Sequence, residues 1–455
     1  MYRFPRFCLD IFVVAEGSSN RLIIFRMFLK SIKRIPIESH YTSSSRIYWS
    51  ISLLLVIAFI LKLVHASMMY IANLDINSFG FTEFLINFEG GFVRRGLFGE
   101  ILLSICAITG LQPQWIILLL SYGAFAFVLI FFFKRFFKLR YCWWLILSPL
   151  FLGSLFFLVR KDFILYTALI AMFWLVKDNV PSITHKIIAT GIAALGLFLH
   201  EAFFFFGIPI FIMLLLSDKS NRVLNYFIVI TLVFVFMILC VFKGNIDNVY
   251  AIINSWNEVL SDKPIEYRFV NSIGAIGWNA AWTFIMHLKS NIGYGGGCMG
   301  IFVQPMFMIA AYYFMTNFLF VFMNDRRDTC KDKTALAALY LFLLLCLQPM
   351  FTVLSCDGSR IYQYASVATF STFVIFRNNR ILNMFPKWYI NIVDRINETL
   401  TYLLPPSKGL MVLLLLFLAQ STGGFSFSIS YAQSIIGTIS GEIFTCVRHL
   451  SYFIL

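Results

Sequence analysis

Long apolar runs recur from one end of this 455-residue chain to the other, and they limit what the chain can fold into. A segment such as WIILLLSYGAFAFVLIFFF (115–133) is apolar on every face and approaches the ~20 residues that a helix needs to cross a bilayer. A membrane barrel would instead alternate apolar and polar residues in strands of about ten residues. With 60% hydrophobic and 13% charged residues, the composition is not that of an ordinary soluble globule. The sequence therefore predicts an all-α, polytopic integral membrane protein.

The predicted transmembrane helices number about eleven, judged by the length of each apolar run. They cover residues 48–66, 114–133, 141–159, 163–176, 187–199, 202–216, 223–242, 298–322, 334–354, 361–376 and 409–427. Residues 97–110 are too short to span comfortably, so we expect a re-entrant half-helix packed at the outer surface. Two amphipathic stretches, 20–34 and 387–404, are expected to lie along the inner leaflet as interfacial helices.

Basic residues decide the predicted orientation. If each predicted span crosses the membrane once, six segments lie on the same side of it, and they contain most of the 36 Lys and Arg residues. These segments are 1–46, 134–140, 177–186, 218–222, 325–333 and 377–408. Cytoplasmic loops of membrane proteins carry such an excess, so the N terminus is predicted to be cytoplasmic. Because the net charge of +14 comes largely from these short segments, nucleic-acid binding is disfavoured.

The chain is predicted to have three parts. Residues 1–46 form a cytoplasmic N-terminal segment with no cleavable signal peptide, 47–427 form the transmembrane domain, and 428–455 form a C-terminal tail. Longer extracytoplasmic loops are expected at 67–113 and 243–297. The second carries three tryptophans and a GYGGG stretch, which favour an interfacial lid over a soluble domain.

Charged residues interrupt or end the apolar runs on the predicted outer side. They are Glu89, Arg94, Arg95 and Glu100; then Arg160, Lys161 and Asp162; then His200 and Glu201; and then Asp357 with Arg360. A charge within the edge of the hydrocarbon costs roughly 2–3 kcal/mol or more, so such groups usually pair or line a polar cavity. Because four separate segments supply them at one depth, we expect one shared site.

The residue types in this predicted site favour an anionic ligand. Arginine forks suit phosphate oxygens, and the glycines around Arg94 and Arg95 let the backbone bend closely around a ligand. Desolvation can turn a carboxylate into a general base, and His200 could be a base, a proton shuttle or a positioning donor. Plainer readings stay open: a headgroup anchor for the arginine pair, and internal neutralisation within residues 160–162 and between Asp357 and Arg360.

Neither a metal nor a disulfide framework is predicted. The nine cysteines are scattered singly with no CxxC or Cys/His cluster, and His200 with Glu201 supplies too few ligands for a metal. Cys298 and Cys356 fall near the predicted outer face, where they could pair or simply pack as small core residues. No cofactor is expected.

The pattern EGGFVRRGLFGE (89–100), RKD (160–162), HEAFFFFGIP (200–209) and DGSR (357–360) resembles the Wzy-type O-antigen and capsule repeat-unit polymerases. The resemblance covers scattered motifs over about residues 85–365. It implies a metal-independent transfer at the periplasmic face of the bacterial inner membrane. A growing glycan on undecaprenyl pyrophosphate would move onto the next lipid-linked repeat unit. The 243–297 loop departs from the pattern because it lacks a second arginine-rich motif.

The resemblance also suggests roles for single residues. In the broader GT-C-like membrane glycosyltransferases an acidic residue of the first outer loop often serves as base, and Glu89 matches it here, with Asp75 and Glu83 as rivals. Glu201 with His200 is the second choice. The pyrophosphate and the glycan are expected to bind the remaining residues: Arg94, Arg95, Arg160, Lys161, Asp162, Asp357 and Arg360.

Partners and competing functions follow from the same resemblance. The expected partners are an undecaprenyl-pyrophosphate-linked oligosaccharide, membrane lipids, and the chain-length regulator and flippase of the same pathway. An O-antigen ligase or another polyprenyl-linked membrane glycosyltransferase is the nearest alternative. A polysaccharide flippase or other transporter is the second, although it would place charges along a midplane pathway and often shows internal repeats, none of which is visible.

Overall fold

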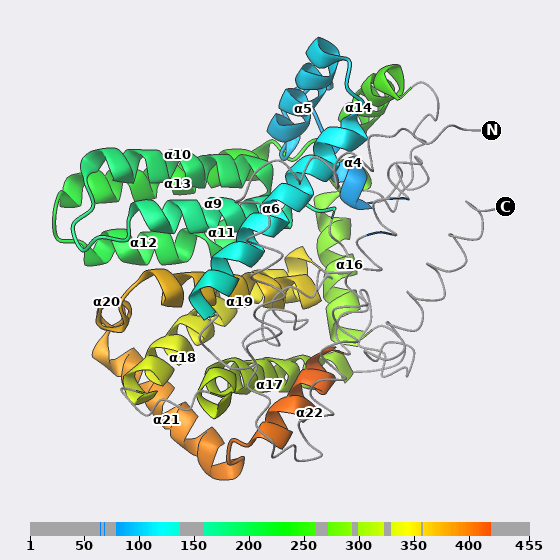
Figure 1. Ribbon diagram of the computed structural model, residues 1–455. Helices are drawn as coiled ribbons and strands as arrows, with labels where there is room; N and C mark the ends of the chain where they lie inside the picture. Colours follow the sequence, from blue (N-terminus) through cyan, green and yellow to red (C-terminus); the bar gives the residue numbers. More distant parts are fainter. Residues whose placement is uncertain are drawn as a thin grey trace, which may run out of the picture. The chain divides into compact units, whose positions relative to one another are not determined.

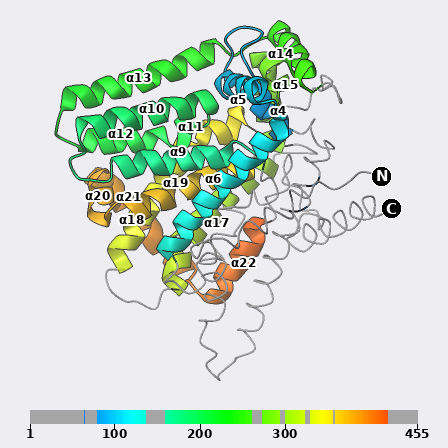
Figure 2. The same cartoon turned by 45° about the horizontal axis from the view of Figure 1, so that its top comes forward.

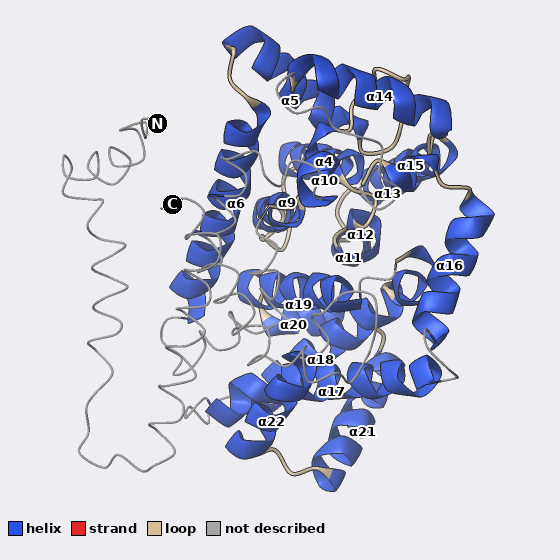
Figure 3. Ribbon diagram, turned by 90° about the vertical axis from the view of Figure 1, so that its right-hand side faces the viewer, coloured by secondary structure: helices blue, strands red, loops and turns tan. Residues whose placement is uncertain are grey.

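A computed structural model of the chain describes residues 64, 68, 79–136, 159–260, 272–293, 299–322, 329–355 and 358–419. All of them belong to one compact unit, Val56–Leu455. Every regular element among them is a helix, and none of these residues forms a strand (Figure 3). The all-α prediction is confirmed. The predicted spans at 48–66 and 141–159 lie almost entirely outside the described residues, as do the 20–34 stretch and the C-terminal tail.

The helices follow one another along the chain as Figure 1 labels them. They are α4 (Phe79–Leu85), α5 (Gly96–Thr109), α6 (Pro113–Phe136), α9 (Asp162–Leu175), α10 (Ile183–Leu199), α11 (Phe203–Phe206), α12 (Ile208–Ser217), α13 (Arg222–Val241), α14 (Ile246–Val259), α15 (Gly274–Gly277), α16 (Ala280–Gly293), α17 (Met299–Phe322), α18 (Thr329–Cys346), the π-helix η3 (Met350–Leu354), α19 (Gly358–Ile375), α20 (Asn378–Asn383), α21 (Lys387–Leu403) and α22 (Lys408–Ala419).

Most predicted segments coincide with single helices, and two are interrupted. The half-helix expected at 97–110 is α5, and the amphipathic stretch at 387–404 is α21. The segment 202–216 divides at Gly207 into α11 and α12, and 334–354 leaves the α-helix after Cys346 and ends in η3. Pro209 and Pro349 lie at these two breaks, and a proline has no N–H to continue the helical hydrogen bonds.

Two of the described helical segments are long and apolar enough to cross a bilayer alone. They are Pro113–Lys134 within α6 and Arg222–Val241, which is α13. Five shorter apolar segments accompany them: Gly96–Thr109, Asp162–Leu175, Ile183–Leu199, Phe203–Ser217 and Pro305–Val321. The count of about eleven spans stays a prediction.

A hydrophobic core joins α4, α5, α6, α14 and α15 and fixes the loop that carries the arginine pair. Its largest member is Trp256 of α14, which is fully buried and donates its indole N–H to Leu85 O at 2.6 Å. At Gly99 a Cβ would lie only 2.0 Å from Ile86 O, so α5 can pass the chain that leaves α4 only with glycine there. The path of residues 86–95 is thereby set from both ends.

Helix α9 lies between α6, α10 and α19, and α10 also packs against α13 (Figures 1 and 2). The first residues of α9 and the last residue of α10 therefore lie at the same end of this helix pair. At the other end of α10, Lys186 Nζ forms a buried ion pair with Asp218 Oδ2 at 2.6 Å and a 3.0 Å hydrogen bond to Asn225 Oδ1. This second polar group fixes the turn between α12 and α13.

Candidate functional site

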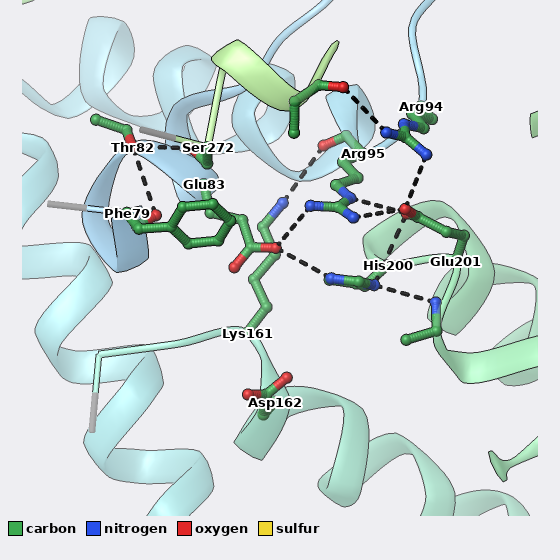
Figure 4. A network of polar contacts seen from close by, with 12 residues as sticks. Phe79, Thr82, Glu83, Arg94, Arg95, Lys161, Asp162, His200, Glu201 and Ser272 are labelled. Carbon is green, nitrogen blue, oxygen red and sulfur yellow. Dashed lines mark hydrogen bonds and ion pairs between the residues drawn. The ribbon is translucent and has the colours of Figure 1, made fainter. Parts of the chain in front are cut away.

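Side chains from five separated segments converge in one place, which we call the charged cluster; Figure 4 labels all of its members except Arg360. Its members are Glu83 of α4; Arg94 and Arg95, which precede α5; Lys161 and Asp162 at the start of α9; His200 and Glu201 after α10; and Arg360 of α19. Glu83, Lys161 and Asp162 are fully buried. The sequence predicted that charged residues of separate segments share one site, and in the structure these side chains are in direct contact.

Glu201 holds both arginines of the pair. Arg95 donates from Nε to Glu201 Oε2 at 2.8 Å and from Nη2 to Oε1 at 2.5 Å, which is a two-pronged guanidinium–carboxylate contact. Arg94 adds a hydrogen bond from Nη1 to Oε1 at 3.1 Å and another from Nη2 to Ala275 O at 3.2 Å. One carboxylate is therefore shared by two guanidinium groups.

The backbone at Arg95 is held in an unusual conformation. Its φ of 65° and ψ of 3° lie in the left-handed region, which among the described non-glycine residues only Arg95 and Asn221 adopt with a positive φ. Such a conformation costs of order 1–3 kcal/mol and persists only where surrounding contacts fix it. Here Lys161 Nζ donates to Arg95 O at 3.4 Å, and the Arg95 side chain is fixed by two carboxylates. These contacts hold the left-handed backbone at Arg95 and keep its side chain in the cluster.

Glu83 is a fully buried carboxylate of the cluster, and one of its oxygens is left without a hydrogen bond from the described residues. Its Oε1 lies 3.3 Å from Arg95 Nη1 and 3.3 Å from His200 Nε2, although the second contact is not aligned as a hydrogen bond. Its Oε2 is buried without a hydrogen-bond partner and lies 3.9 Å from Arg360 Nη2. A buried acceptor of this kind has the capacity to receive a proton or a hydroxyl donor from a ligand.

Asp162 forms an ion pair with Arg360. Arg360 donates to both oxygens of Asp162, at 2.7 Å from Nη2 and at 2.8 and 3.0 Å from Nε. The Tyr364 hydroxyl adds a 2.7 Å hydrogen bond to Asp162 Oδ1. This pairing joins α9 to α19 and balances the charge of Asp162 within the protein.

His200 is neutral in this setting. Its Nδ1 accepts the Ala202 backbone N–H at 3.0 Å, which places the ring proton on Nε2. Burial, reinforced by the positive charge of Arg95, lowers the pKa of the imidazole well below its ordinary value. The ring is thus an N–H donor beside Glu83.

The cluster carries one more positive than negative charge. Four cations (Arg94, Arg95, Lys161 and Arg360) face three carboxylates (Glu83, Asp162 and Glu201), with His200 neutral. Burial alone would raise the pKa of the Glu201 carboxyl, but the two arginine charges outweigh it and hold that pKa well below its ordinary value. Burial lowers the pKa of Lys161 to about 8, against a raising effect of Glu83. The excess charge suits an anionic ligand.

Several residues expected in the site lie elsewhere. Glu89 is exposed, and its backbone N–H donates to Asn87 Oδ1, so the structure does not bring its carboxylate to the arginines. Glu100 accepts the Phe88 N–H at 3.1 Å and supports the loop. Arg160, next to Lys161 in the chain, is partly buried. Asp357, like Cys298 and Cys356, lies outside the described residues.

Two members of the site were underrated or missed by sequence reasoning. Glu83 figured only as a rival to Glu89, although a lone carboxylate within the apolar stretch FTEFLINF is itself a signal of a buried functional charge. Tyr364 gave no such signal, because a tyrosine four residues after Arg360 in an apolar helix looks like ordinary core. Only the packing of α19 against α9 reveals its contact.

The arrangement is suited to binding an anion and moving a proton beside it. Two guanidinium groups and an ammonium group supply donors, and Glu83 supplies a buried acceptor. No group of three His, Cys, Asp or Glu side chains that could hold a metal ion occurs among the residues described. In comparisons with protein-family models, curated proteins and solved structures, no match to this chain was found.

Proposed function

We propose that this chain is a multi-pass glycosyltransferase of the bacterial inner membrane that polymerises lipid-linked oligosaccharide repeat units into surface polysaccharide, O-antigen or capsule. The charged cluster is the observation that carries the proposal. Transfer from a polyprenyl-pyrophosphate donor needs cations for the departing pyrophosphate and a base for the attacking hydroxyl. The cluster supplies both within a few ångströms.

The exposed surface of α13 supports the membrane part of the proposal. Large apolar side chains are exposed along this helix: Val223, Tyr226, Phe227, Ile230, Phe234, Met237 and Val241. Soluble monomers rarely expose an apolar face of this extent, and lipid would cover it without cost. The length and composition of α6 and α13 agree with this arrangement.

In the proposed reaction, Arg94 and Arg95 bind the pyrophosphate and Glu83 is the base. The acceptor hydroxyl attacks the anomeric carbon of the donor sugar and gives its proton to Glu83. The bond from that carbon to the pyrophosphate oxygen breaks, and the arginines stabilise the charge that develops on the leaving group. Glu83 Oε1 faces Arg95 Nη1 and His200 Nε2, each at 3.3 Å, whereas Oε2 has no hydrogen-bond partner among the residues described and is the oxygen that would accept the hydroxyl proton.

The geometry favours Glu83 over the two bases that the sequence suggested. Glu201 is held as a carboxylate by two arginines, and its pKa lies well below the ordinary value because their charges outweigh its burial, which makes it a weak base. Glu89 is exposed and separate from the arginines in the contacts observed. We therefore assign the base role to Glu83 and not to Glu201 or Glu89.

The test compares Glu83→Gln with Glu89→Gln in a strain that lacks the gene, with surface glycan separated on a gel. Loss of a general base lowers the rate by roughly 10²- to 10⁴-fold, so Glu83→Gln should abolish the ladder and leave single repeat units. Glu89→Gln, an identical chemical change at an exposed site, should keep the ladder. Wild-type ladders in Glu83→Gln at normal expression would refute the assignment.

The same strain separates the alternative functions. Without a ligase, full-length polymer would accumulate on its lipid carrier instead of single repeat units. Without a flippase, repeat units would stay on the cytoplasmic side, out of reach of a periplasmic glycosidase. Either pattern in the deletion strain would replace the polymerase proposal.

A further inference from the structure

Glu201 occupies the arginine pair in the way that a phosphoryl group would. The Nε and Nη2 edge of Arg95 grips both carboxylate oxygens at 2.8 and 2.5 Å, and the same fork fits two oxygens of a phosphate. Arg94 Nη1 contributes a third contact at 3.1 Å. An external anion that bound these donors would have to take the place of Glu201.

Some hydrogen-bond donors of the cations in the cluster have no acceptor in the described part of the chain when Glu201 is bound to the arginines. Arg94 Nε is buried with no hydrogen-bond acceptor. Lys161 is fully buried, and no carboxylate of the described residues lies within ion-pair distance of its Nζ. A phosphoryl group brings more oxygens and more negative charge than one carboxylate, so it would satisfy donors that Glu201 leaves unused.

Glu201 is also placed where it can be exchanged. Its side chain and that of Arg94 are 19% and 21% exposed, whereas Glu83 in the same cluster is fully buried, so a ligand meets this pair first. The carboxylate receives hydrogen bonds only from Arg94 and Arg95 among the described residues. It stands in the turn between α10 and α11, outside either helix.

We propose that Glu201 is an internal anion that keeps Arg94 and Arg95 paired in the free protein and is displaced by the phosphoryl group of the ligand. The inference rests on the proposed function only in taking the ligand to be a phosphoryl anion. Before the ligand binds, Glu201 keeps two adjacent, partly buried cations from facing each other unpaired. Once it is displaced, both arginines are free to bind the phosphoryl group.

The Lys186–Asp218 pair provides a matched control. It is also an ion pair of the α10 region, at 2.6 Å, but it is buried and lies at the opposite end of α10. Asp218 also accepts hydrogen bonds from the Ser220 N–H and hydroxyl, at 2.8 and 2.9 Å, so it is fixed by its own turn. Asp218→Asn therefore makes the same chemical change as Glu201→Gln without touching the charged cluster.

The experiment is calorimetric titration of the purified full-length protein in detergent with inorganic pyrophosphate at pH 7. Glu201→Gln should bind pyrophosphate about tenfold more tightly than wild type, because a competing charge-assisted contact has been removed. Asp218→Asn should bind like wild type. Equal or weaker binding by Glu201→Gln, with Asp218→Asn unchanged, would show that Glu201 organises the arginines and is not displaced.

A second measurement covers the case in which Glu201→Gln does not fold. Hydrogen exchange of the wild-type protein should become faster over residues 200–202 when pyrophosphate is added, because their turn loses its anchor on the arginines. Unchanged or slower exchange there would overturn the proposal. The two proposals fail under different results. If Glu201→Gln binds pyrophosphate more tightly but no glycan ladder depends on the gene, the polymerase proposal is refuted and the displacement of Glu201 still stands.

Discussion

Lys161 is the cation of the charged cluster whose charge is sensitive to pH near neutrality. Burial lowers its pKa from 10.5 to about 8; Glu83 and Glu201 act against that shift, and Arg95 and Arg360 add to it. Between about pH 8 and 10.5 the folded protein binds fewer protons than the unfolded chain. The free energy of unfolding therefore rises with pH across that window. When the pH falls, the same gain is lost, and the loss is complete once the pH has passed below about 8.

The titration of Lys161 predicts how anion affinity varies with pH. Wild-type protein should bind pyrophosphate more weakly at pH 9 than at pH 7, because the neutral amine no longer attracts the anion. Deprotonation of pyrophosphate itself would act in the opposite direction, so the sign identifies the protein group. The measurement is calorimetric titration at several pH values.

Two substitutions at Lys161 make this prediction specific. Lys161→Arg stays charged at both pH values and should lose the weakening at pH 9. Lys161→Gln should bind weakly throughout and without the downward trend. A fall in affinity that persists in Lys161→Arg would assign the pH dependence to another group.

At the scale of the helix, the crossing of α5 over the chain that leaves α4 depends on one glycine. A Cβ at residue 99 would lie 2.0 Å from the backbone oxygen of Ile86, and backbone cannot move aside as a side-chain end can. Gly99→Ala should destabilise the protein by about 1–3 kcal/mol and weaken pyrophosphate binding, since the arginine loop is shifted.

Gly123 of α6 provides the counterpart to Gly99. A Cβ there would meet nothing within 4 Å, and alanine is favoured over glycine in a helix interior. Gly123→Ala should leave binding unchanged and raise stability by roughly 0.5–1 kcal/mol. Thermal unfolding in detergent measures both variants, and equal effects of the two substitutions would contradict the close crossing.

For the whole molecule, the distribution of basic residues predicts topology. Reporter fusions should place residues 137, 220 and 328 in the cytoplasm, because positively charged loops are retained there. Fusions near 95, 265 and 358 should report an outer location. A cytoplasmic signal near residue 95 would remove the periplasmic site from the proposal.

The sequence by itself determined the helical class and much of the segmentation. Apolar runs of helical length set the positions of α6, α9, α10 and α13, because a chain this apolar satisfies its backbone polar groups within each helix. Charges within apolar runs also marked Arg94, Arg95, Lys161, His200, Glu201 and Arg360 as members of a site, since each would be costly to bury alone.

Only the tertiary structure decided which charges face one another. Glu83 and Glu89 are six residues apart, and the sequence favoured Glu89 for its place beside the glycines. The close crossing at Gly99 and the burial of Trp256 set the path of the chain, which turns Glu83 into the cluster and leaves Glu89 exposed. Ion pairs between residues more than a hundred positions apart, such as Arg95 with Glu201, depend on helix packing, which local sequence patterns do not encode.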